Sequence, residues 1–192
     1  MRYTPGVNTT QGEGHRDAIV FRGVRSTANF YLDGARDDVQ YYRSLYNIEQ
    51  VEVIKGANAM LFGRGGQGGL INRVTKKAMV GESFRSIDAG MDSFGAFDVA
   101  FDTNMDMSDS SALRLMFHSD TLENHRDHYD GDRLGFNAVY RTELDADNTL
   151  DLSYELVDHE RFIDRGIPTG ADNYPVEHLR DCLLYTSPSP RD

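Results

Sequence analysis

The sequence is poor in cysteine and contains no tryptophan. A single cysteine, Cys182, excludes a disulfide framework and a zinc site built from several cysteines. No apolar run approaches the ~20 residues that a membrane-spanning helix needs, and the opening residues, MRYTPGVNTT, are not those of a signal peptide. These absences argue against a helical membrane protein. They do not test spanning strands, because such strands alternate in polarity.

Positive charge is scarce in the later part of the chain, where no lysine follows Lys77. The net charge of −11 argues against a nucleic-acid partner held by phosphate contacts. Eleven Lys and Arg stand against seven Asp and Glu through Met79, whereas nine stand against twenty-four from Val80 onward. This shift predicts two segments, residues 1–79 and 80–180, with a boundary near residues 76 to 82.

The last twelve residues, DCLLYTSPSPRD at 181–192, differ from the rest of the chain. They hold the only cysteine and an S-P-S-P run, and they resemble the translation of a sequencing-adaptor read-through. We interpret them as a non-native tail and exclude them from the fold prediction.

A glycine-rich stretch, FGRGGQGGLINRVTKK at 62–77, places Gly63, Gly65 and Gly68 in the G-x-G-x-x-G spacing of a dinucleotide-binding loop. Such a loop follows a strand and opens a helix, because the helix N-terminus holds the pyrophosphate. Here the order is reversed: GANAMLFG favours a short helix before the loop, and GLINRVTKK alternates as a strand after it. The glycines therefore indicate a sharp turn in a crowded space. A dinucleotide-dependent oxidoreductase remains an alternative that rests on this triplet alone.

The run from Phe21 to Lys77 contains an ordered series of short motifs: Arg22-Gly23, Asp33-Gly34, Ile48-Glu49, Val51-Glu52-Val53, Gly56, Leu61-Phe62-Gly63, Gly68-Gly69, Ile71-Asn72 and Thr75-Lys76. With these motifs the run resembles the second half of the plug domain of TonB-dependent outer-membrane receptors, siderophore-uptake branch. Residues Lys55, Ala57 and Gln67 depart from the family pattern, where Arg, Pro and Pro are usual.

This segment is predicted to form part of an α+β plug domain. AIVFRG and NFYLDG are expected to pair as strands with Asp33-Gly34 as a turn, SLYNIEQ to form a helical turn, and VEVIKG to form a strand. The resemblance implies that four charged residues pair where the plug meets the barrel, since an unpaired buried charge is costly. The alternative for them is solvated surface charge. They are Arg22, Glu49, Glu52 and Lys55.

Beyond residue 80, apolar and polar residues alternate in five stretches: FRSIDAGM, FDVAF, ALRLMFH, LGFNAVYR and LDLSYELVD. Such alternation fits any half-buried antiparallel strand, including those of a soluble β-rich binding or structural module. Connections that alternate between short and long favour a transmembrane β-barrel instead. With the plug resemblance, we expect a truncated barrel of about five strands whose Leu, Phe and Tyr face lipid and whose Arg, Asp, Asn and Glu face the plug.

No catalytic arrangement is expected, and the histidines and acidic residues of HRDH and DGD read as loop charge, with no metal site and no cofactor. A ferric siderophore would instead be held by plug loops facing the exterior, because guanidinium pairs with anionic oxygens and aromatic rings pack on the organic shell. Solvated loop residues are the alternative for these positions. The predicted ligand-binding residues are Arg25, Asn29, Arg36, Gln40, Tyr41, Tyr42 and Arg43.

The resemblance therefore implies a fragment of an active transporter in the outer membrane of a Gram-negative bacterium, which imports ferric siderophores; a heme-like or cobalamin-like complex is the alternative cargo. A TonB-type energy-transducing protein would grip a segment expected upstream of Met1, and lipid would surround the strands. Because five strands cannot close a barrel, the 192-residue chain alone is expected to aggregate.

Overall fold

The computed structural model describes residues 4–10, 16–26, 29–56, 68–127, 129–164, 166–167 and 169–177. Within these ranges the elements are strands arranged in three sheets, and no helix is long and apolar enough to cross a membrane. The helical part of the predicted α+β plug is therefore not seen in the described residues. Only Gly56 of the short helix predicted at 56–63 lies in the described residues. The tail at 181–192 lies outside them.

The described residues up to Thr75 form two small sheets, which we call the N-terminal unit. Its first sheet has the order β1-β2-β3, with β1 at Val7–Thr10, β2 at Ala18–Phe21 and β3 at Val24–Ser26. Its second has the order β5-β4-β7-β6, with β4 at Phe30–Leu32, β5 at Ala35–Arg36, β6 at Ile48–Ile54 and β7 at Leu70–Thr75.

One predicted strand pairing and one predicted helical turn in this unit are wrong. β2 pairs with β1 and β3, and β4 pairs with β5 and in parallel with β7, so AIVFRG and NFYLDG do not pair with each other. SLYNIEQ forms only a tight turn, in which the Ile48 amide donates to the Leu45 carbonyl at 3.1 Å, before Ile48 opens β6. The β-branched Val51 and Val53 then favour the extended backbone.

Two dipeptides of the family pattern close tight hairpins. In the first, Arg22 and Gly23 have φ values of 47° and 87° and connect β2 to β3. In the second, Asp33 and Gly34 have φ values of 49° and 81° and connect β4 to β5. Positive φ at both central residues is the geometry of a type I′ turn, which matches the twist of the strands that it joins. The predicted turn at Asp33-Gly34 is confirmed, and Arg22 lies in a second one.

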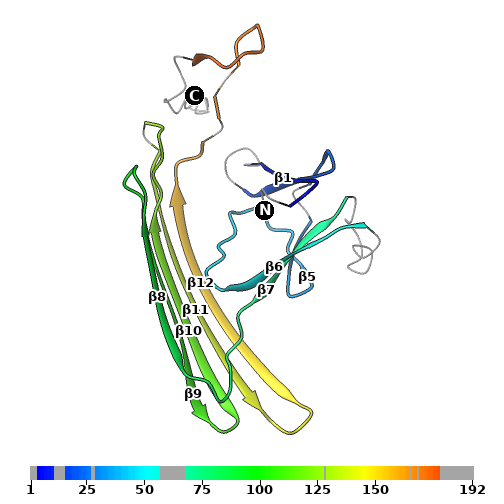
Figure 1. Ribbon diagram of the computed structural model, residues 1–192, viewed down its shortest axis with the longest axis vertical. Helices are drawn as coiled ribbons and strands as arrows, with labels where there is room; N and C mark the ends of the chain where they lie inside the picture. The colour runs from blue at the N-terminus through cyan, green and yellow to red at the C-terminus, as the bar shows by residue number, and fades with distance from the viewer. Residues whose placement is uncertain are drawn as a thin grey trace, which may run out of the picture.

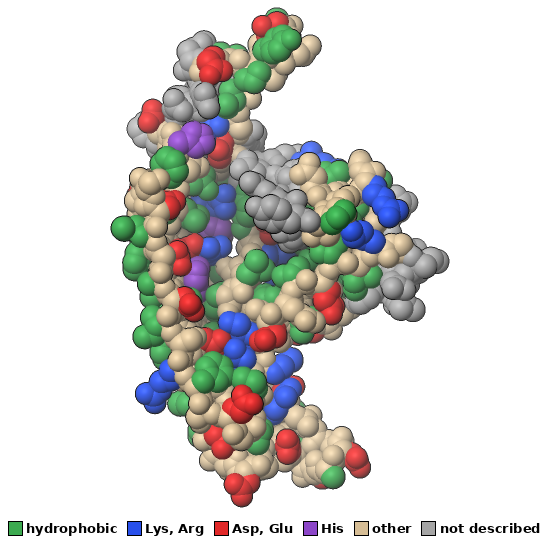
Figure 2. All heavy atoms as spheres, viewed as in Figure 1, with side chains coloured by type: hydrophobic (Ala, Val, Ile, Leu, Met, Phe, Trp, Pro, Cys, Tyr) green, Lys and Arg blue, Asp and Glu red, His purple; other side chains and the backbone are tan. Residues whose placement is uncertain are grey.

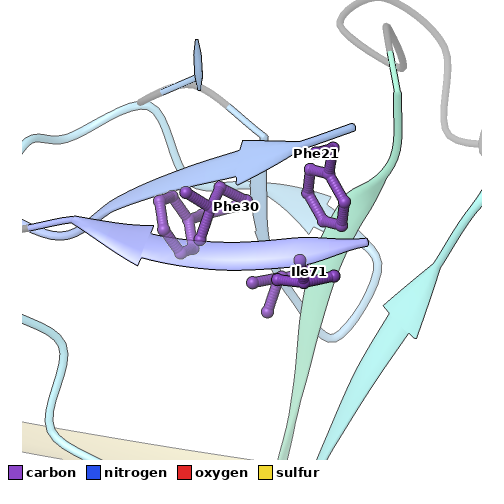
Figure 3. Close-up of a cluster of buried hydrophobic side chains, with 5 residues drawn as sticks. Phe21, Phe30 and Ile71 are labelled. Carbon is purple, nitrogen blue, oxygen red and sulfur yellow. The ribbon is translucent and has the colours of Figure 1, made fainter. Parts of the chain in front are cut away.

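The two sheets of the N-terminal unit share a hydrophobic core. Phe21 and Ile19 from β2 pack with Phe30 from β4 and Ile71 from β7, and all four are at most 2% exposed (Figure 3). Gly68 and Gly69, just before β7, have φ values of 89° and 149°, and a Cβ on Gly68 would lie 2.9 Å from the Phe21 Cβ. These glycines are required by crowding against Phe21, as the sequence predicted. Because a strand, β7, and not a helix follows Gly68 and Gly69, the dinucleotide-loop alternative is wrong; Gly63 and Gly65 themselves lie outside the described residues.

Five long antiparallel strands between Phe84 and Arg161 form a third sheet, which we call the curved sheet. They are β8 at Phe84–Met91, β9 at Phe97–Ser108, β10 at Ser111–Thr121, β11 at Gly131–Glu143 and β12 at Thr149–Arg161, each paired with the next. All five predicted strands are confirmed. The sheet bends around the N-terminal unit, which lies on its concave side (Figure 1). Residues 76–83, which join the two parts, contain the predicted boundary at 79.

The two faces of the curved sheet reverse the usual distribution of polarity. One in-register row on the convex face consists of apolar side chains, of which Ile87 and Leu156 are 72% and 48% exposed. The concave face instead buries polar side chains, and Figure 2 shows charged groups between the sheet and the N-terminal unit, with hydrophobic ones along the outer edge. The convex row is Ile87, Phe101, Phe117, Phe136 and Leu156. The buried polar residues of the concave face include Asp102, Asn104, Arg114, Asp120 and Asn137.

Candidate functional site

A buried ion cluster fastens the N-terminal unit to the curved sheet. Asp102 on β9 accepts hydrogen bonds from Arg114 Nε and Nη2 on β10, at 2.8 and 2.7 Å, and from Lys76 Nζ at 2.9 Å. Arg114 Nη1 also donates to the Lys77 carbonyl at 3.0 Å. Since two cations share one carboxylate, the segment just after β7 is held by both charge and hydrogen bonds.

The same segment is held by the side chain of Asn104 on β9, which is 1% exposed. Its Nδ2 donates to the carbonyls of Met79 and Glu82, at 2.8 and 2.6 Å, while its Oδ1 accepts from the Met79 amide at 3.0 Å. Ala78 is fully buried in an apolar cluster with Ala112, Met116 and Val139 of the sheet. The join between the two parts is therefore rigidly specified by polar and apolar contacts together.

Tyr46, in the turn before β6, packs on the curved sheet where Gly135 leaves the space of a side chain. A Cβ on Gly135 of β11 would lie 2.7 Å from Tyr46 Cε1, so only glycine leaves room for the ring. The ring stacks on His118 with a centroid distance of 5.7 Å, and its hydroxyl donates to Glu155 at 3.3 Å. Burial and the neighbouring Glu155 carboxylate raise the pKa of Tyr46 well above its usual range.

The loop from Asp37 to Arg43 is shaped by a buried arginine. Arg43 Nε donates to Asp37 at 2.9 Å, its Nη2 donates to the Val39 carbonyl at 2.6 Å, and its Cζ lies 4.1 Å from the Phe30 ring centroid. Arg73 on β7 donates to the same Asp37 carboxylate at 2.6 Å. Two buried guanidinium groups thus fix one carboxylate and, through it, the path of the loop.

A cleft of about 620 Å³ separates this loop from the upper end of β12. It is lined on one side by residues of the N-terminal unit, including Gln40, Tyr41, Tyr42 and Arg73, and on the other by residues of β12, including Glu155, His159 and Arg161. Burial raises the pKa of both Tyr41 and Tyr42, which therefore stay neutral in the physiological range.

The predicted ligand-binding residues do not all lie at this cleft. Gln40, Tyr41 and Tyr42 line it. Arg43 is buried and holds the loop through its hydrogen bonds to Asp37 and Val39. Asn29, which is 3% exposed, donates to the Gly69 carbonyl at 2.9 Å within the N-terminal unit. The two remaining arginines, Arg25 and Arg36, are exposed outside it, where Arg36 pairs with Asp38 at 2.6 Å.

Of the four charged residues predicted at the plug–barrel contact, Glu49 faces the curved sheet, with its carboxylate 3.9 Å from Arg114 Nη1. Glu52 accepts from Asn72 at 2.8 Å, and Lys55 donates to the Pro5 carbonyl at 2.6 Å, both within the N-terminal unit. Arg22 occupies the β2–β3 turn, where its amide donates to the Gly6 carbonyl. Contacts of these last three with further barrel strands stay a prediction.

Three residues of the cleft were missed by sequence reasoning: Arg73, His159 and Arg161. The predicted fifth strand, LDLSYELVD, ends at Asp158, whereas the strand in the structure, β12, continues to Arg161. Extending it would have placed His159 and Arg161 on the same face as Glu155. Within the described part of the chain, no group of three His, Cys, Asp or Glu side chains forms a metal site.

Comparison with known proteins defines the class. Residues 1–70 match the family described as TonB-dependent Receptor Plug Domain. The probable TonB-dependent receptor BfrD of Bordetella pertussis is 32% identical over 173 residues, which cover 88% of this chain and 23% of that protein. The chain therefore belongs to the TonB-dependent receptors, which reside in the outer membrane of Gram-negative bacteria and are not enzymes.

Two solved structures share the fold of this chain. The ferric-catecholate import receptor Fiu from Escherichia coli K12, in its open form, superimposes with a TM-score of 0.78 at 32% identity, over 87% of this chain and 25% of that one. The siderophore receptor PiuA from Acinetobacter baumannii gives a TM-score of 0.80 at 28% identity, over 88% and 25%. The chain thus shares the fold of a segment of these two receptors, and it spans about a quarter of their length.

Proposed function

We propose that β8–β12 are the first strands of a transmembrane β-barrel and that the N-terminal unit is the later part of the plug inside it. The observation that carries this proposal is the reversed polarity of the curved sheet. Its buried face holds Asp102, Asn104 and Arg114 against the N-terminal unit, while a row of Ile, Phe and Leu side chains faces outward. A soluble sheet would bury the apolar row, whereas lipid outside and a polar plug inside favour this arrangement.

Strand length and connections support the same proposal. β9 to β12 contain 11 to 13 residues, enough for a tilted strand to cross the ~30 Å hydrocarbon core, which takes ~9–11 residues. The β9–β10 turn consists of Asp109 and Ser110 alone, whereas residues 122–130 connect β10 to β11 at the opposite end. Short turns at one end and longer loops at the other are typical of outer-membrane barrels, whose longer loops face the exterior. The cleft beside His159 and Arg161 then opens toward the outside of the cell.

We infer that the whole receptor binds a ferric siderophore in this region and imports it, energised by a TonB-type partner. The relatives named above include a ferric-catecholate import receptor and a siderophore receptor, which favours this ligand class. Gln40, Tyr41 and Tyr42 are proposed to contact the ligand directly, and Arg43 to hold their loop in place. No cofactor is required for this role, since the iron complex is the cargo.

Uptake measurements test the proposal. The full-length receptor carrying this segment is expressed in a Gram-negative strain without its own siderophore receptors, and uptake of radioactive iron from a panel of ferric siderophores is followed. We expect uptake of at least one complex that stops when the TonB-type protein is deleted. Uptake that is equal with and without that protein, or absent for every complex, would refute the function.

The barrel topology has its own test. Spin labels at Phe117 and at Met116, neighbours on β10, should differ sharply in their environment. A label at Phe117 should be accessible to lipid-soluble oxygen, and a label at Met116, which is 1% exposed against the N-terminal unit, should be accessible to neither oxygen nor a polar quencher. Equal oxygen accessibility at both positions would contradict a lipid-facing convex surface.

A further inference from the structure

We propose that Arg161 is a positioning residue that couples the 37–43 loop of the N-terminal unit to the 122–130 loop, which connects β10 to β11. Arg161 is the last residue of β12, and its side chain contacts both loops. The inference rests on the proposed function, because the 37–43 loop carries the proposed ligand contacts. What it adds is a physical link from that loop to the outer end of the curved sheet.

The contact with the 37–43 loop is made through Tyr42. Arg161 Cζ lies 3.6 Å from the centroid of the Tyr42 ring, which is the geometry of a close cation–π contact. Asp17, just before β2, interacts electrostatically with Arg161, and its carboxylate also accepts a hydrogen bond from the Arg43 amide at 2.8 Å. Arg161 is therefore attracted to the N-terminal unit both by an aromatic face and by a negative charge.

The contact with the 122–130 loop is made through Tyr129. Arg161 Nη2 donates to the Tyr129 hydroxyl at 3.1 Å, and its Cζ lies 5.9 Å from the centroid of that ring. Arg161 also pairs in register with Gly131, where the chain leaves the loop and enters β11. A Cβ on Gly131 would lie 2.7 Å from the Arg161 Cβ, so this end of the loop packs closely against Arg161.

Two further contacts join the 122–130 loop to the residues that follow β12. The Phe162 amide donates to the Asp130 carbonyl at 2.9 Å, and Arg126 Nη1 lies 3.5 Å from an Asp164 carboxylate oxygen. The side chains of Arg126 and Asp164 are only 5% and 10% exposed, so salt and water screen this pair little. The loop is thus bound to β12 and its continuation, and its position depends on where Arg161 is held.

Tyr42 and Tyr129 share one guanidinium group, and this sharing is what couples the two loops. A planar guanidinium can offer its face to one ring while its edge donates to a hydroxyl, as that of Arg161 does here. If Tyr42 moves away, the guanidinium loses the contact that fixes its plane, and its hydrogen bond to Tyr129 weakens. Two sites that act on one shared element have a coupling free energy, and the coupling acts in both directions. A displacement of the 37–43 loop would therefore alter the 122–130 loop, and the reverse.

Hydrogen exchange on the full-length receptor, with no ligand present, tests the coupling. The amides of Leu122 and Phe162 are the probes, since they donate to the carbonyls of Gly131 and Asp130 at 2.7 and 2.9 Å. Tyr42→Leu removes the ring, and we expect both amides to exchange roughly five- to thirtyfold faster, the range for loss of a partly to fully desolvated cation–π contact. Tyr42→Phe keeps the ring and should stay within about twofold of the wild type.

A double-mutant cycle separates coupling from general loosening. In the Arg161→Met background the shared guanidinium is absent, so Tyr42→Leu should have no further effect on either amide. Unchanged exchange in Tyr42→Leu would overturn the coupling. An equal acceleration in the presence and absence of Arg161 would also overturn it.

The matched control is Tyr46→Leu. Tyr46 is another tyrosine through which the N-terminal unit packs on the curved sheet, but its ring stacks on His118 and its hydroxyl donates to Glu155. Its replacement should leave the amides of Leu122 and Phe162 unchanged, and an acceleration equal to that of Tyr42→Leu would contradict the proposal. Because no ligand takes part, this experiment and the uptake test of the proposed function can fail separately.

Discussion

Replacing Asp102 with asparagine removes the one carboxylate that Arg114 and Lys76 share. Asparagine keeps the shape of the side chain but leaves two cations facing each other, with the Asp102 and Arg114 side chains only 12% and 7% exposed. Breaking a buried pair by removing one partner costs ~3–5 kcal/mol. Glu49, 3.9 Å from Arg114 Nη1, compensates little, because its side chain is 61% exposed and screened by water. We therefore expect Asp102→Asn to weaken docking of the N-terminal unit by about 3 kcal/mol.

Hydrogen exchange on the full-length receptor measures this loss. The amides of Met79 and Gly81 donate to the side chains of Asn104 and Asp106 on β9, at 3.0 and 2.9 Å, so their exchange reports opening of the join. A loss of about 3 kcal/mol would speed their exchange roughly a hundredfold, since 1.4 kcal/mol is a factor of ten. Amides in the middle of β10 and β11 should be unaffected.

Asp151→Asn serves as the control for this experiment. Asp151 binds Arg141 on the same face of the sheet, at 2.7 Å, but both side chains are about 30% exposed, so the pair should contribute less than ~1 kcal/mol. If Asp102→Asn and Asp151→Asn changed exchange equally, or if neither did, the ion cluster would not be what fastens the two parts.

Three further outcomes are expected. Gly68→Ala should lower the melting temperature of the receptor more than Gly56→Ala, because both glycines have positive φ but only Gly68 meets a neighbour, Phe21. Gly135→Ala should loosen the N-terminal unit, measured by exchange, and the added Tyr46→Ala should restore it; no rescue would mean that the ring does not occupy the gap. Because the folded-state pKa of Tyr46 is raised above its unfolded value of 10.0, the contribution of this group to stability is complete below pH 10 and is lost as the pH rises further. An absorbance titration should therefore show one late-ionising tyrosine that is missing from Tyr46→Phe.

The curved sheet could be predicted from the sequence because each strand pairs with the next one along the chain, so the alternation of residues and the short turns between strands define it. Each strand repeats an apolar residue every second position, and Asp109-Ser110 or the LDADN turn fixes the register of neighbouring strands. The polar positions on the concave face were recognisable for the same reason. Their partners were not, since the bond from Asp102 to Lys76 spans 26 residues and depends on how the N-terminal unit is seated.

The N-terminal unit was harder to predict because its pairings are long-range. The parallel pairing of β4 with β7 joins Phe30 to Ile71, which no turn sequence encodes. The i to i+3 spacing of Leu45 and Ile48 is common to a helical turn and to the tight turn that the chain forms. Tertiary packing of Val51 and Val53 against the shared core decides between the two.

The polar contact between the N-terminal unit and the curved sheet has a consequence for movement. An apolar interface of the same area would cost free energy in proportion to the surface exposed when it separates. The ion pair between Lys76 and Asp102 contributes little net stability, because water recovers the solvation of each charge once the two part, yet it fixes one register while it lasts. The apolar cluster around Ala78 and Met116 is small and lies beside the join, so it anchors one edge. A plug held in this way can be specific in its resting position and still be released by a pulling partner, which is what the proposed transport requires.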